Sequence, residues 1–514
     1  MSEHVFLYGP PGSGKSTLGL RLAHELGRHF VDLDEQIKKR AGRSIESIFA
    51  EEKEAGFRTH ESRILAEVLA EQDAVIALGG GTLLDVRNRN LVESAGQVLL
   101  LNVSPELLVA RQKTDSTIRP LSQDETALSS LLKQRAEHYA SFPTKLEVGN
   151  IPLDELAWQA QITLGAFHVT GMGPGYDVRV HSGALEQLGT YLQARQLNGP
   201  VAMITDQNVE PLYANRVLAA LLDAGYKVES LAVPPGERYK SMETVAQLWE
   251  FLLQSGIERS STVVALGGGV ITDLAGFASS TFLRGVPWVA VPTTLLAMAD
   301  ASLGGKTGID LPQGKNLVGA FYPPRLVLSD PGTLDTLPEP ELRSGMGEVI
   351  KHGIISDPQL FEMCMQGLDV LANDWSSLVR RAMAVKIKVL KEDPYEQGLR
   401  AALNLGHTIG HAVELASGFK LRHGEAIAIG MVAEARLAEK MGLAESGLAD
   451  TICEGIQKLE LPTEIPSNMS PDRLAQIMLK DKKKASGVVR FALPTRIGEV
   501  VTGIEVSDLE GAFS

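Results

Sequence analysis

The chain has 514 residues, more than one hydrophobic core usually covers, so the sequence predicts more than one domain. Its 44% of hydrophobic and 22% of charged residues are ordinary for a soluble globular protein. The net charge of −14 argues against broad binding to nucleic acid or to an anionic membrane surface. The two cysteines, Cys364 and Cys453, have no CxxC spacing, and neither a signal peptide nor a membrane-length apolar run is seen. We therefore expect a cytoplasmic protein.

The chain opens with a phosphate-binding motif. Residues 4–8 form an apolar strand that ends at Gly9-x-x-x-x-Gly14-Lys15-Ser16, and a helical pattern follows. The glycines let backbone N–H groups face phosphate oxygens, the lysine reaches the β- and γ-phosphates, and the serine hydroxyl can ligate Mg²⁺. A glycine-rich turn without nucleotide is the alternative, but the strand before and the helix after favour binding of a nucleoside triphosphate.

Further polar motifs follow the next strands and helices of residues 1–165. They are Asp32-Leu-Asp34, Gly56-Phe57-Arg58, Gly79-Gly80-Gly81, Arg119-Pro120-Leu121, and Arg135 ahead of Tyr139. Any one of these arginines, taken alone, is more often a solvated surface charge. The ordered set, however, resembles shikimate kinase. The resemblance implies a nucleoside-monophosphate-kinase-like domain with a parallel sheet, which transfers a phosphoryl group from ATP, with Mg²⁺, to shikimate.

The resemblance also implies roles for these residues. The expected ATP contacts are Gly12, Ser13, Gly14, Lys15, Ser16, Thr17, Arg111 and Arg119, with Ser16 and Asp32 at Mg²⁺. The expected shikimate contacts are Asp34, Arg58, Gly79, Gly80, Gly81 and Arg135. Asp34 would orient the acceptor hydroxyl, while Lys15 and Arg119 would neutralise the transferring phosphoryl group.

Two positions depart from the family pattern: Lys53 replaces a glycine and Ser122 a leucine, which bears on lid behaviour and affinity. The alternatives for this domain are a gluconate- or adenylate-kinase-like enzyme and a non-catalytic nucleotide-binding module.

The remainder of the chain predicts two further domains. Residues 166–175, which end in Gly-Met-Gly-Pro-Gly, are expected to be a linker. Strand patterns near residues 176–180, 201–205, 228–233, 262–266 and 288–291 predict an α/β domain over residues 176–338. Helical patterns then dominate residues 339–514. In the α/β part, Gly267-Gly268-Gly269 between a strand and a helix suits a dinucleotide pyrophosphate, although it is not the GxGxxG fingerprint.

Three of the 11 histidines lie close together at positions 407, 411 and 423. His407 and His411 are four residues apart and so share one face of a helix. Two imidazoles with a third donor can hold a catalytic zinc ion. Spacing alone would pair His407 with His411, and a helix face with polar contacts but no metal is the alternative.

Residues 168–514 as a whole resemble 3-dehydroquinate synthase. The motifs include Pro235-Gly-Glu237, Gly267–Asp273, Pro292-Thr293-Thr294, Glu348-Val-Ile-Lys351 and the histidine region. The resemblance implies an NAD-dependent conversion of 3-deoxy-D-arabino-heptulosonate 7-phosphate to 3-dehydroquinate and phosphate, with NAD regenerated in every turnover. The fold implied is an α/β NAD-binding domain followed by a mostly α-helical metal-binding domain.

The same resemblance implies the site residues of this second enzyme. The expected NAD contacts are Asp206, Asn208, Glu237, Lys240, Gly268, Gly269, Asp273, Thr293, Thr294, Lys306 and Lys315. Zinc, or cobalt in its place, would be held by Glu348, His407 and His423, which leaves His411 as a substrate partner. The expected substrate contacts are Arg284, Asp300, Lys306, Asn316, Lys351, Lys386, Arg400, Asn404 and His411. Of these, we expect catalytic roles for Lys306, Lys351, Arg400, Asn404 and His411.

The alternatives for this second part share its fold. A polyol dehydrogenase would not need so many phosphate-directed cations, and a cyclase acting on a substrate without a carboxylate would leave Arg400 without a partner. The resemblance also suggests a homodimer through the cyclase part, with Arg284 a candidate to reach the neighbouring subunit. We expect no nucleic-acid or membrane partner, and no channelling, because the two reactions are not consecutive in the aromatic pathway.

Overall fold

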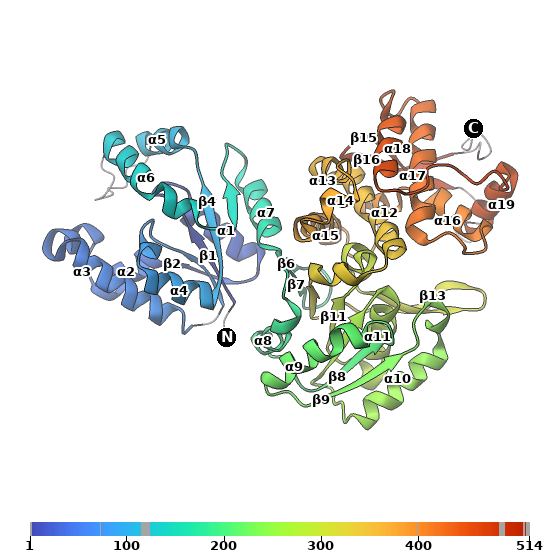
Figure 1. Ribbon diagram of the computed structural model, residues 1–514, viewed down its shortest axis with the longest axis horizontal. Helices are drawn as coiled ribbons and strands as arrows, with labels where there is room; N and C mark the ends of the chain where they lie inside the picture. The colour runs from blue at the N-terminus through green and yellow to red at the C-terminus, as the bar shows by residue number, and fades with distance from the viewer. Residues whose placement is uncertain are drawn as a thin grey trace. The chain divides into compact units, whose positions relative to one another are not determined.

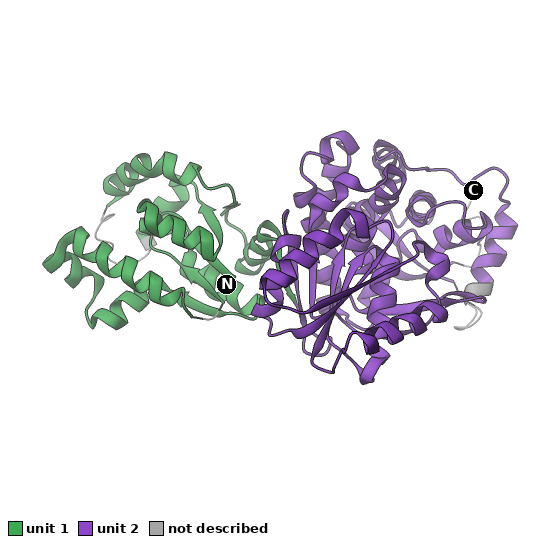
Figure 2. Ribbon diagram, turned by 60° about the horizontal axis from the view of Figure 1, so that its bottom comes forward, with its two compact units in different colours: residues 1–168 green, residues 169–514 purple. Residues whose placement is uncertain are grey.

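The computed structural model describes residues 3–71, 73–114, 124–396, 398–482, 489–506 and 509. The chain divides into two compact units, residues 1–168 and residues 169–514 (Figure 2). The boundary falls within strand β6 (Ala166–Val169), in the segment where the sequence suggested a linker. None of the helices among the described residues is long and apolar enough to cross a membrane.

Unit 1 is built on a parallel sheet of five strands in the order β2-β3-β1-β4-β5 (Figure 1). The strands are β1 (His4–Tyr8), β2 (His29–Asp32), β3 (Ala74–Ala77), β4 (Gly96–Asn102) and β5 (Lys145–Glu147). The helices are α1 (Lys15–Glu25), α2 (Leu33–Ala41), α3 (Ile45–Val68), η1 (Thr82–Leu84), α4 (Val86–Ala95), α5 (Pro105–Thr114), α6 (Glu125–Ala140) and α7 (Leu153–Leu164). β1 and β3 are buried throughout, as expected for central strands covered on both faces.

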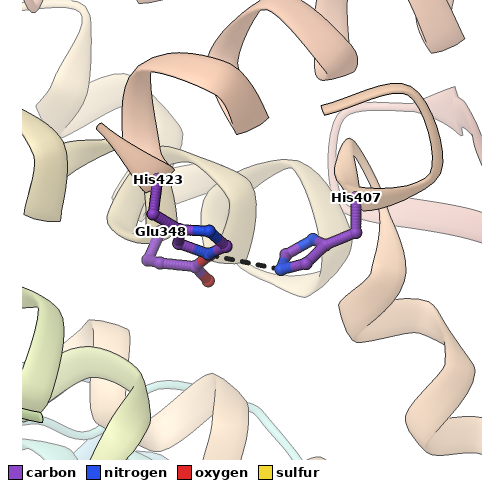
Figure 3. A group of neighbouring side chains, drawn as sticks. All are labelled: Glu348, His407 and His423. Carbon is purple, nitrogen blue, oxygen red and sulfur yellow. Dashed lines mark ion pairs between the residues drawn. The ribbon is translucent and has the colours of Figure 1, made fainter. Parts of the chain in front are cut away.

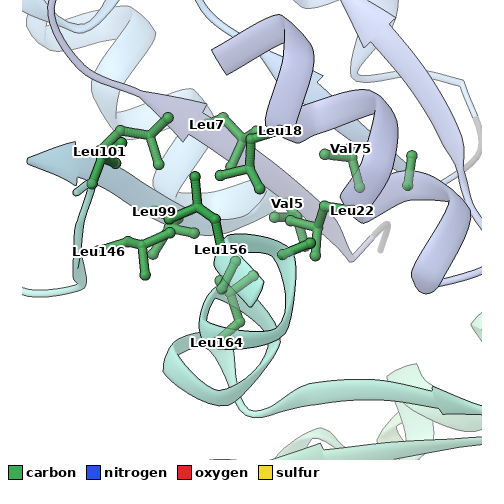
Figure 4. Close-up of a cluster of buried hydrophobic side chains, with 14 of the residues drawn as sticks. Val5, Leu7, Leu18, Leu22, Val75, Leu99, Leu101, Leu146, Leu156 and Leu164 are labelled. Atoms are coloured by element: carbon green, nitrogen blue, oxygen red, sulfur yellow. The ribbon is translucent and has the colours of Figure 1, made fainter. Parts of the chain in front are cut away.

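The alternation of side chains along β1 creates two hydrophobic cores. Val5 and Leu7 belong to the first core, with Leu18 of α1 and Leu156 of α7 (Figure 4). Phe6 and Tyr8 point to the opposite face and pack with residues of α2 and α3. The sheet is thus fixed from both sides, and the loops at the carboxyl ends of its strands start from rigid positions.

Helix α3 is interrupted at Lys53, where the sequence departs from the family pattern. Lys53 has φ 60° and ψ −171°, a backbone conformation outside the helical region. A residue with a Cβ atom in this region carries about 1–3 kcal/mol of strain, whereas glycine adopts it readily. The kink therefore explains why the family pattern has a glycine at position 53. In this chain the strain of Lys53 is local to α3.

Unit 2 begins with a sheet of seven strands in the order β6-β7-β14-β11-β10-β8-β9. Its strands after β6 are β7 (Tyr176–Val180), β8 (Asn198–Asp206), β9 (Val228–Val233), β10 (Ser261–Gly267), β11 (Trp288–Pro292) and β14 (Leu326–Ser329). The helices of this part are η2 (Leu185–Gln187), α8 (Leu188–Ala194), η3 (Glu210–Ala214), α9 (Asn215–Asp223), η4 (Glu237–Tyr239), α10 (Met242–Gln254), α11 (Gly269–Thr281), η5 (Phe282–Arg284), η6 (Ala297–Ala301) and η7 (Pro331–Thr336). A hairpin of β12 (Lys306–Leu311) and β13 (Gly314–Phe321) projects from it.

The second part of unit 2 is mostly helical. Its helices are α12 (Glu339–Ser356), α13 (Pro358–Cys364), α14 (Leu368–Leu371), α15 (Trp375–Glu392), η8 (Leu399–Asn404), α16 (His407–Ala416), α17 (His423–Lys440), α18 (Leu448–Lys458) and α19 (Pro471–Lys482). A hairpin of β15 (Arg490–Arg496) and β16 (Glu499–Glu505) follows, which the helical patterns of this region did not predict. Phe491 and Leu493 of β15 are buried in the same core as α16 and α17, so tertiary packing accounts for this hairpin. The α/β and helical fold classes are otherwise confirmed.

Two candidate active sites

In unit 1 the phosphate-binding loop connects β1 to α1 at the carboxyl edge of the sheet. The ammonium group of Lys15 lies over this loop and donates to the carbonyl oxygens of Gly9 and Pro10, both at 2.9 Å. Gly14 has φ 93°, a conformation that favours glycine, directly before α1. Arg111 of α5 reaches the loop and donates to the carbonyl of Ser13 at 3.2 Å. The predicted ATP-site residues within the described part of the chain therefore gather at one helix N-terminus.

Two oxygen donors lie side by side next to this loop. The hydroxyl of Ser16 donates to Oδ2 of Asp32 at 2.5 Å, and Oδ1 of Asp32 accepts from the N–H of Asp34 at 3.0 Å, which caps α2. Hydroxyl and carboxylate oxygens are the ligand types that Mg²⁺ takes. Burial raises the pKa of Asp34 to about 6, and the nearby carboxylates of Asp32 and Glu61 act in the same direction.

Two arginines converge on the glycine segment after β3. A Cβ atom at Gly81 would lie 2.6 Å from Nη2 of Arg58 and 3.2 Å from Nη1 of Arg135, so a larger residue there would displace the ends of these two side chains. Arg135 donates to the carbonyl of Gly80 at 2.8 Å. Arg58 donates to the fully buried carboxylate of Glu61 at 2.7 Å, which fixes its orientation. Two converging guanidinium groups suit recognition of a carboxylate.

The two halves of this site share one cavity of about 900 Å³. The predicted residues that line it are Gly12, Ser13, Gly14, Lys15, Ser16, Thr17, Asp32, Asp34, Arg58, Gly79, Gly80, Gly81, Arg111 and Arg135. The segment with Arg119 and Ser122 lies outside the described residues. Sequence reasoning did not single out Glu61, which lies one helical turn after Arg58 and also accepts from the hydroxyl of Thr82 at 2.6 Å.

In unit 2, Glu348, His407 and His423 meet although they come from three different helices (Figure 3). Oε1 of Glu348 lies 3.6 Å from Nε2 of His407 and 3.3 Å from Nε2 of His423. Nδ1 of His407 lies 3.1 Å from the carbonyl of Leu405, a contact that leaves Nε2 facing the carboxylate. One ligand atom from each of the three residues lies within 4.8 Å of the others.

Close packing of α12 against α17 brings Glu348 and His423 together. A Cβ atom at Gly424, next to His423, would lie 1.8 Å from the carbonyl oxygen of Ser344 in α12. A Cβ atom at Gly347, next to Glu348, would lie 2.6 Å from the carbonyl oxygen of Gly424. Any larger residue at either position would push α12 and α17 apart and separate Glu348 from His423.

The electrostatics of this cluster favour a cation. Glu348 is fully buried, and its carboxylate pairs with the Lys351 ammonium and faces the two imidazoles. Burial alone would raise the pKa of Glu348, but Lys351 and the two imidazoles hold it well below its usual range. Burial and Lys351 lower the pKa of His407, which keeps its imidazole neutral. An anionic carboxylate and imidazoles are a donor set that fits zinc.

His411 lies on the cavity side of this cluster. Its ring centroid is 5.1 Å from that of His407 and 5.8 Å from that of His423. His411 forms a separate group of possible metal ligands with Glu414 and His423. It does not belong to the group of Glu348, His407 and His423. Helical spacing pairs His407 with His411, but the buried carboxylate faces His407 and His423.

A cavity of about 1890 Å³ extends from this cluster along the carboxyl edge of the seven-stranded sheet. The predicted residues that line it are Asp206, Asn208, Glu237, Lys240, Gly268, Gly269, Asp273, Thr293, Thr294, Lys315, Asn316, His411 and His423. Within it, Nζ of Lys240 lies 2.6 Å from Oδ2 of Asp273, and burial raises the pKa of this carboxyl to about 6. Ligands of open α/β sheets bind at this edge.

The predicted substrate residues form a second group around Glu348. Lys351 pairs with Glu348, and Nζ of Lys386 lies 2.5 Å from Oδ1 of Asp300. Burial would raise the pKa of Asp300, but the Lys386 ammonium lowers it to about 2. Arg400 is buried, and its Nη1 donates to the carbonyl of Pro394 at 2.7 Å.

Three of the predicted residues that do not line the cavity are exposed on the surface of the described chain. Lys306 is exposed and pairs with Glu396, Asn404 is exposed at the end of η8, and Arg284 is exposed on η5. This chain therefore does not itself bring Arg284 to the cluster.

Glu414 is a further site residue that sequence reasoning missed. Its Oε2 lies 3.4 Å from Nδ1 of His423, and its Oε1 lies 3.0 Å from Nζ of Lys315 on the β12–β13 hairpin. A carboxylate on the far nitrogen of a metal-binding imidazole fixes the orientation of the ring. Because Glu414 is three residues after His411 on α16, the helical periodicity contained the signal for it.

Three family models match this chain. Residues 11–156 match shikimate kinase, residues 230–344 match the N-terminal part of 3-dehydroquinate synthase, and residues 345–484 match its C-terminal part. The 3-dehydroquinate synthase of Symbiobacterium thermophilum is 46% identical over 338 residues, which cover 65% of this chain and 94% of the relative. That of a Synechocystis species is 43% identical over 340 residues, with 65% and 94% covered.

Solved structures of two related cyclases resemble unit 2. One is 2-epi-5-epi-valiolone synthase from Streptomyces hygroscopicus subsp. jinggangensis, with NAD⁺ and Zn²⁺ bound. It is 31% identical with a TM-score of 0.60, and 66% of this chain and 95% of that chain are covered. The other is 2-deoxy-scyllo-inosose synthase with carbaglucose-6-phosphate, NAD⁺ and Co²⁺, at 28% identity and a TM-score of 0.62, with 68% and 99% covered. The chain thus belongs to the 3-dehydroquinate synthase family and carries a shikimate kinase domain ahead of it, which makes it a fusion of two shikimate-pathway enzyme domains.

Proposed function

We propose that this protein catalyses two reactions of the shikimate pathway. Unit 2 converts 3-deoxy-D-arabino-heptulosonate 7-phosphate to 3-dehydroquinate and phosphate, with NAD and a zinc or cobalt ion. Unit 1 transfers the γ-phosphoryl group of ATP, with Mg²⁺, to shikimate. In both reactions the partners of the protein are small-molecule substrates.

The cyclase assignment depends most on one observation, the buried cluster of Glu348, His407 and His423 at the end of the large cavity. Its three donors suit zinc, and the two solved relatives hold NAD⁺ with Zn²⁺ or Co²⁺. When bound, NAD supplies a hydride acceptor and the metal ion acidifies and polarises the substrate oxygen. Glu348 and Glu414 raise the pKa of His423 to about 9 against the effect of burial, so the metal-free site holds a proton that a metal ion would displace.

The cations around the cluster favour a substrate that carries a carboxylate. Lys386 and Arg400 are both buried next to the Asp300 group, where a bound carboxylate would neutralise them. In this proposal Asp300 and Lys351, which lie beside Glu348, would hold ring hydroxyls. His411 and Asn316, which line the cavity, would contact the phosphate end of the substrate. A cyclase for a substrate without a carboxylate, or a polyol dehydrogenase, would leave Arg400 unused.

The kinase assignment depends on the pair of arginines at Gly81 in the same cavity as the phosphate-binding loop. Arg58 and Arg135 would bind the shikimate carboxylate as two planar forks. Asp34, at the same cavity, would orient the acceptor hydroxyl toward the phosphate held over Lys15. A non-catalytic nucleotide-binding module would not need this carboxylate clamp.

Release of phosphate from the heptulosonate phosphate, with NAD, tests the cyclase. We expect release that stops after chelation and returns when Zn²⁺ or Co²⁺ is added. No release by metal- and NAD-replete protein would contradict the proposal, and oxidation of a polyol instead would establish the dehydrogenase.

The kinase is tested by ADP formation from ATP with and without shikimate. We expect turnover only when shikimate and Mg²⁺ are both present. ATP binding without turnover on shikimate would contradict the kinase assignment and favour the non-catalytic module, and turnover on gluconate or AMP would indicate a different kinase.

A further inference from the structure

A buried glutamate on α17 caps the helix that carries His407. Glu434 is fully buried, and its carboxylate faces the first turn of α16. Its Oε2 accepts from the backbone N–H of Gly406 at 2.5 Å, and its Oε1 accepts from the backbone N–H of Ile409 at 3.2 Å. The two contacts bracket His407, so the backbone on both sides of this residue is attached to one carboxylate.

Helix α16 has no cap of its own to replace these contacts. The residue before its first turn is Gly406, which has no side chain and has φ 78°. The first N–H groups of a helix need acceptors, and the helix dipole favours a negative charge beside them. Glu434 therefore supplies from another helix what a capping serine or aspartate supplies locally, and the helix N-terminus in turn compensates the buried charge.

The same region shows the closest packing of α16 against α17. A Cβ atom at Gly430 would lie 2.0 Å from the carbonyl oxygen of Gly406, and one at Gly410 would lie 2.9 Å from the carbonyl oxygen of Ala426. The two helices begin at His407 and His423, the two imidazoles that face Glu348. Glu434 lies on α17, which begins at His423, and its carboxylate binds the N-terminus of α16, which begins at His407.

We propose that Glu434 is a positioning residue of the metal site, which sets the separation of His407 from His423 and Glu348. This inference rests on the proposed function, because it assumes that the three residues bind a metal ion. Glu434 acts through the backbone of α16 and does not itself contact the ion. Groups that hydrogen-bond to metal ligands typically contribute a factor of 10 to 100 in metal affinity, and we expect the lower end of this range for a contact made through the backbone.

The test compares Glu434→Gln with Glu439→Gln in the full-length chain. Glu439 lies on the same helix, is half-buried and accepts from the N–H of Ala449 at 3.0 Å, near the start of α18, so it is a carboxylate that caps a different helix. Chelated protein is titrated with Zn²⁺ against a competing indicator and, separately, with Co²⁺ while the d–d absorption is recorded. We expect Glu434→Gln to raise the Kd at least tenfold and to shift the Co²⁺ bands, and Glu439→Gln to change neither.

A merely structural role would lower the melting temperature of both variants and leave the Co²⁺ spectrum of each unchanged. Folded Glu434→Gln protein with a Kd within about threefold of the parent and an unaltered spectrum would overturn the inference. No uptake of Zn²⁺ or Co²⁺ by the parent protein would instead contradict the metal assignment on which the inference depends.

A second measurement does not require the variant to fold. In the metal-free parent protein, hydrogen exchange at the amides of Gly406 and Ile409 should be slow, because both are bonded to a buried carboxylate. Exchange at the rate of an unprotected amide would show that the cap is not formed and would overturn the inference.

Discussion

The two candidate sites of this chain are assembled in different ways. In unit 1 most of the nucleotide side comes from one continuous segment, residues 9–17, and other residues follow the next strands at one edge of a parallel sheet. In unit 2 the metal cluster draws Glu348, His407 and His423 from three helices, and its geometry depends on how those helices pack.

The comparison shows where each site is sensitive to substitution. A site at the ends of parallel strands takes its positions from the sheet, so changes to single side chains should remove individual contacts and leave the others. A cluster between helices takes its positions from close packing and from buried carboxylates. We therefore expect changes at residues that do not contact the metal ion, such as Glu414, to affect the cluster strongly.

The largest expected effect is at Glu348. Glu348→Gln removes the only anionic donor of the cluster formed with His407 and His423, so metal affinity and phosphate release should each fall more than 100-fold, beyond the effect of outer residues. The measurement is metal content together with phosphate release. ADP formation with shikimate by the same protein is the internal control and should not change; if it fell equally, the two units would not be independent.

Glu414→Gln should have a smaller effect of the same kind. The variant leaves Glu348, His407 and His423 in place but loses the charge that orients the far nitrogen of His423 and pairs with Lys315. We expect a 10- to 100-fold loss of Zn²⁺ affinity by indicator competition. Glu445→Gln, an exposed carboxylate that follows α17, is the control, and equal losses in the two variants would contradict the role of Glu414.

In unit 1, Arg135→Lys should weaken binding of shikimate. Lysine cannot reproduce the planar fork that faces Gly81, so the KM for shikimate should rise about tenfold while the KM for ATP changes little. Initial rates at varied concentrations of each substrate separate the two. Arg87→Lys, on the exposed face of α4, is the control. An equal rise in both KM values would show that the variant distorts the whole cavity.

A change of stability is expected at the kink in α3. Lys53→Gly relieves a backbone conformation that is unfavourable for lysine, and we expect unit 1 to gain about 1 kcal/mol in free energy of unfolding. Lys39→Gly in the regular helix α2 should instead cost about 1 kcal/mol. Urea-dependent hydrogen exchange of β1 and β3 in the full-length chain measures both. A loss of stability in the two variants alike would refute the strain at Lys53.

The smallest expected effect is a pH dependence of unit 1. Burial lowers the pKa of His4 below 6.5, against the opposing charge of Asp73, and its Nδ1 accepts from the N–H of Ala74 at 3.1 Å. Because the fold favours the neutral ring, this contribution to stability is present above pH 6.5 and is lost as the pH falls below it. Hydrogen exchange of β3 at pH 7.5 and 5.5 should show the loss, and His4→Gln should reduce it while exposed His29→Gln should not.

Much of unit 1 could be predicted because its signals are local. The phosphate-binding loop, the Asp32–Asp34 segment and the glycines after β3 each follow an apolar strand, and the carboxyl ends of parallel strands meet at one edge. Five of the seven strands of the second sheet were predicted for the same reason, since buried parallel strands are continuous apolar runs, whereas β14 was not predicted and β6 lies in the segment expected to be a linker. Glu61 was missed because nothing in its local sequence distinguishes a buried glutamate from an exposed one.

The helical part of unit 2 shows what the sequence by itself determined and what only the tertiary structure decided. The sequence determined that helices would form and that His407 and His411 would share one face, because both follow from periodicity along the chain. Periodicity did not determine that Glu348 and His423 would meet His407, which only the resemblance to 3-dehydroquinate synthase implied, because that contact depends on how the helices pack, as at Gly424 and Gly347. Nor did it reveal Glu434, because a cap supplied by another helix leaves no pattern near the helix it caps.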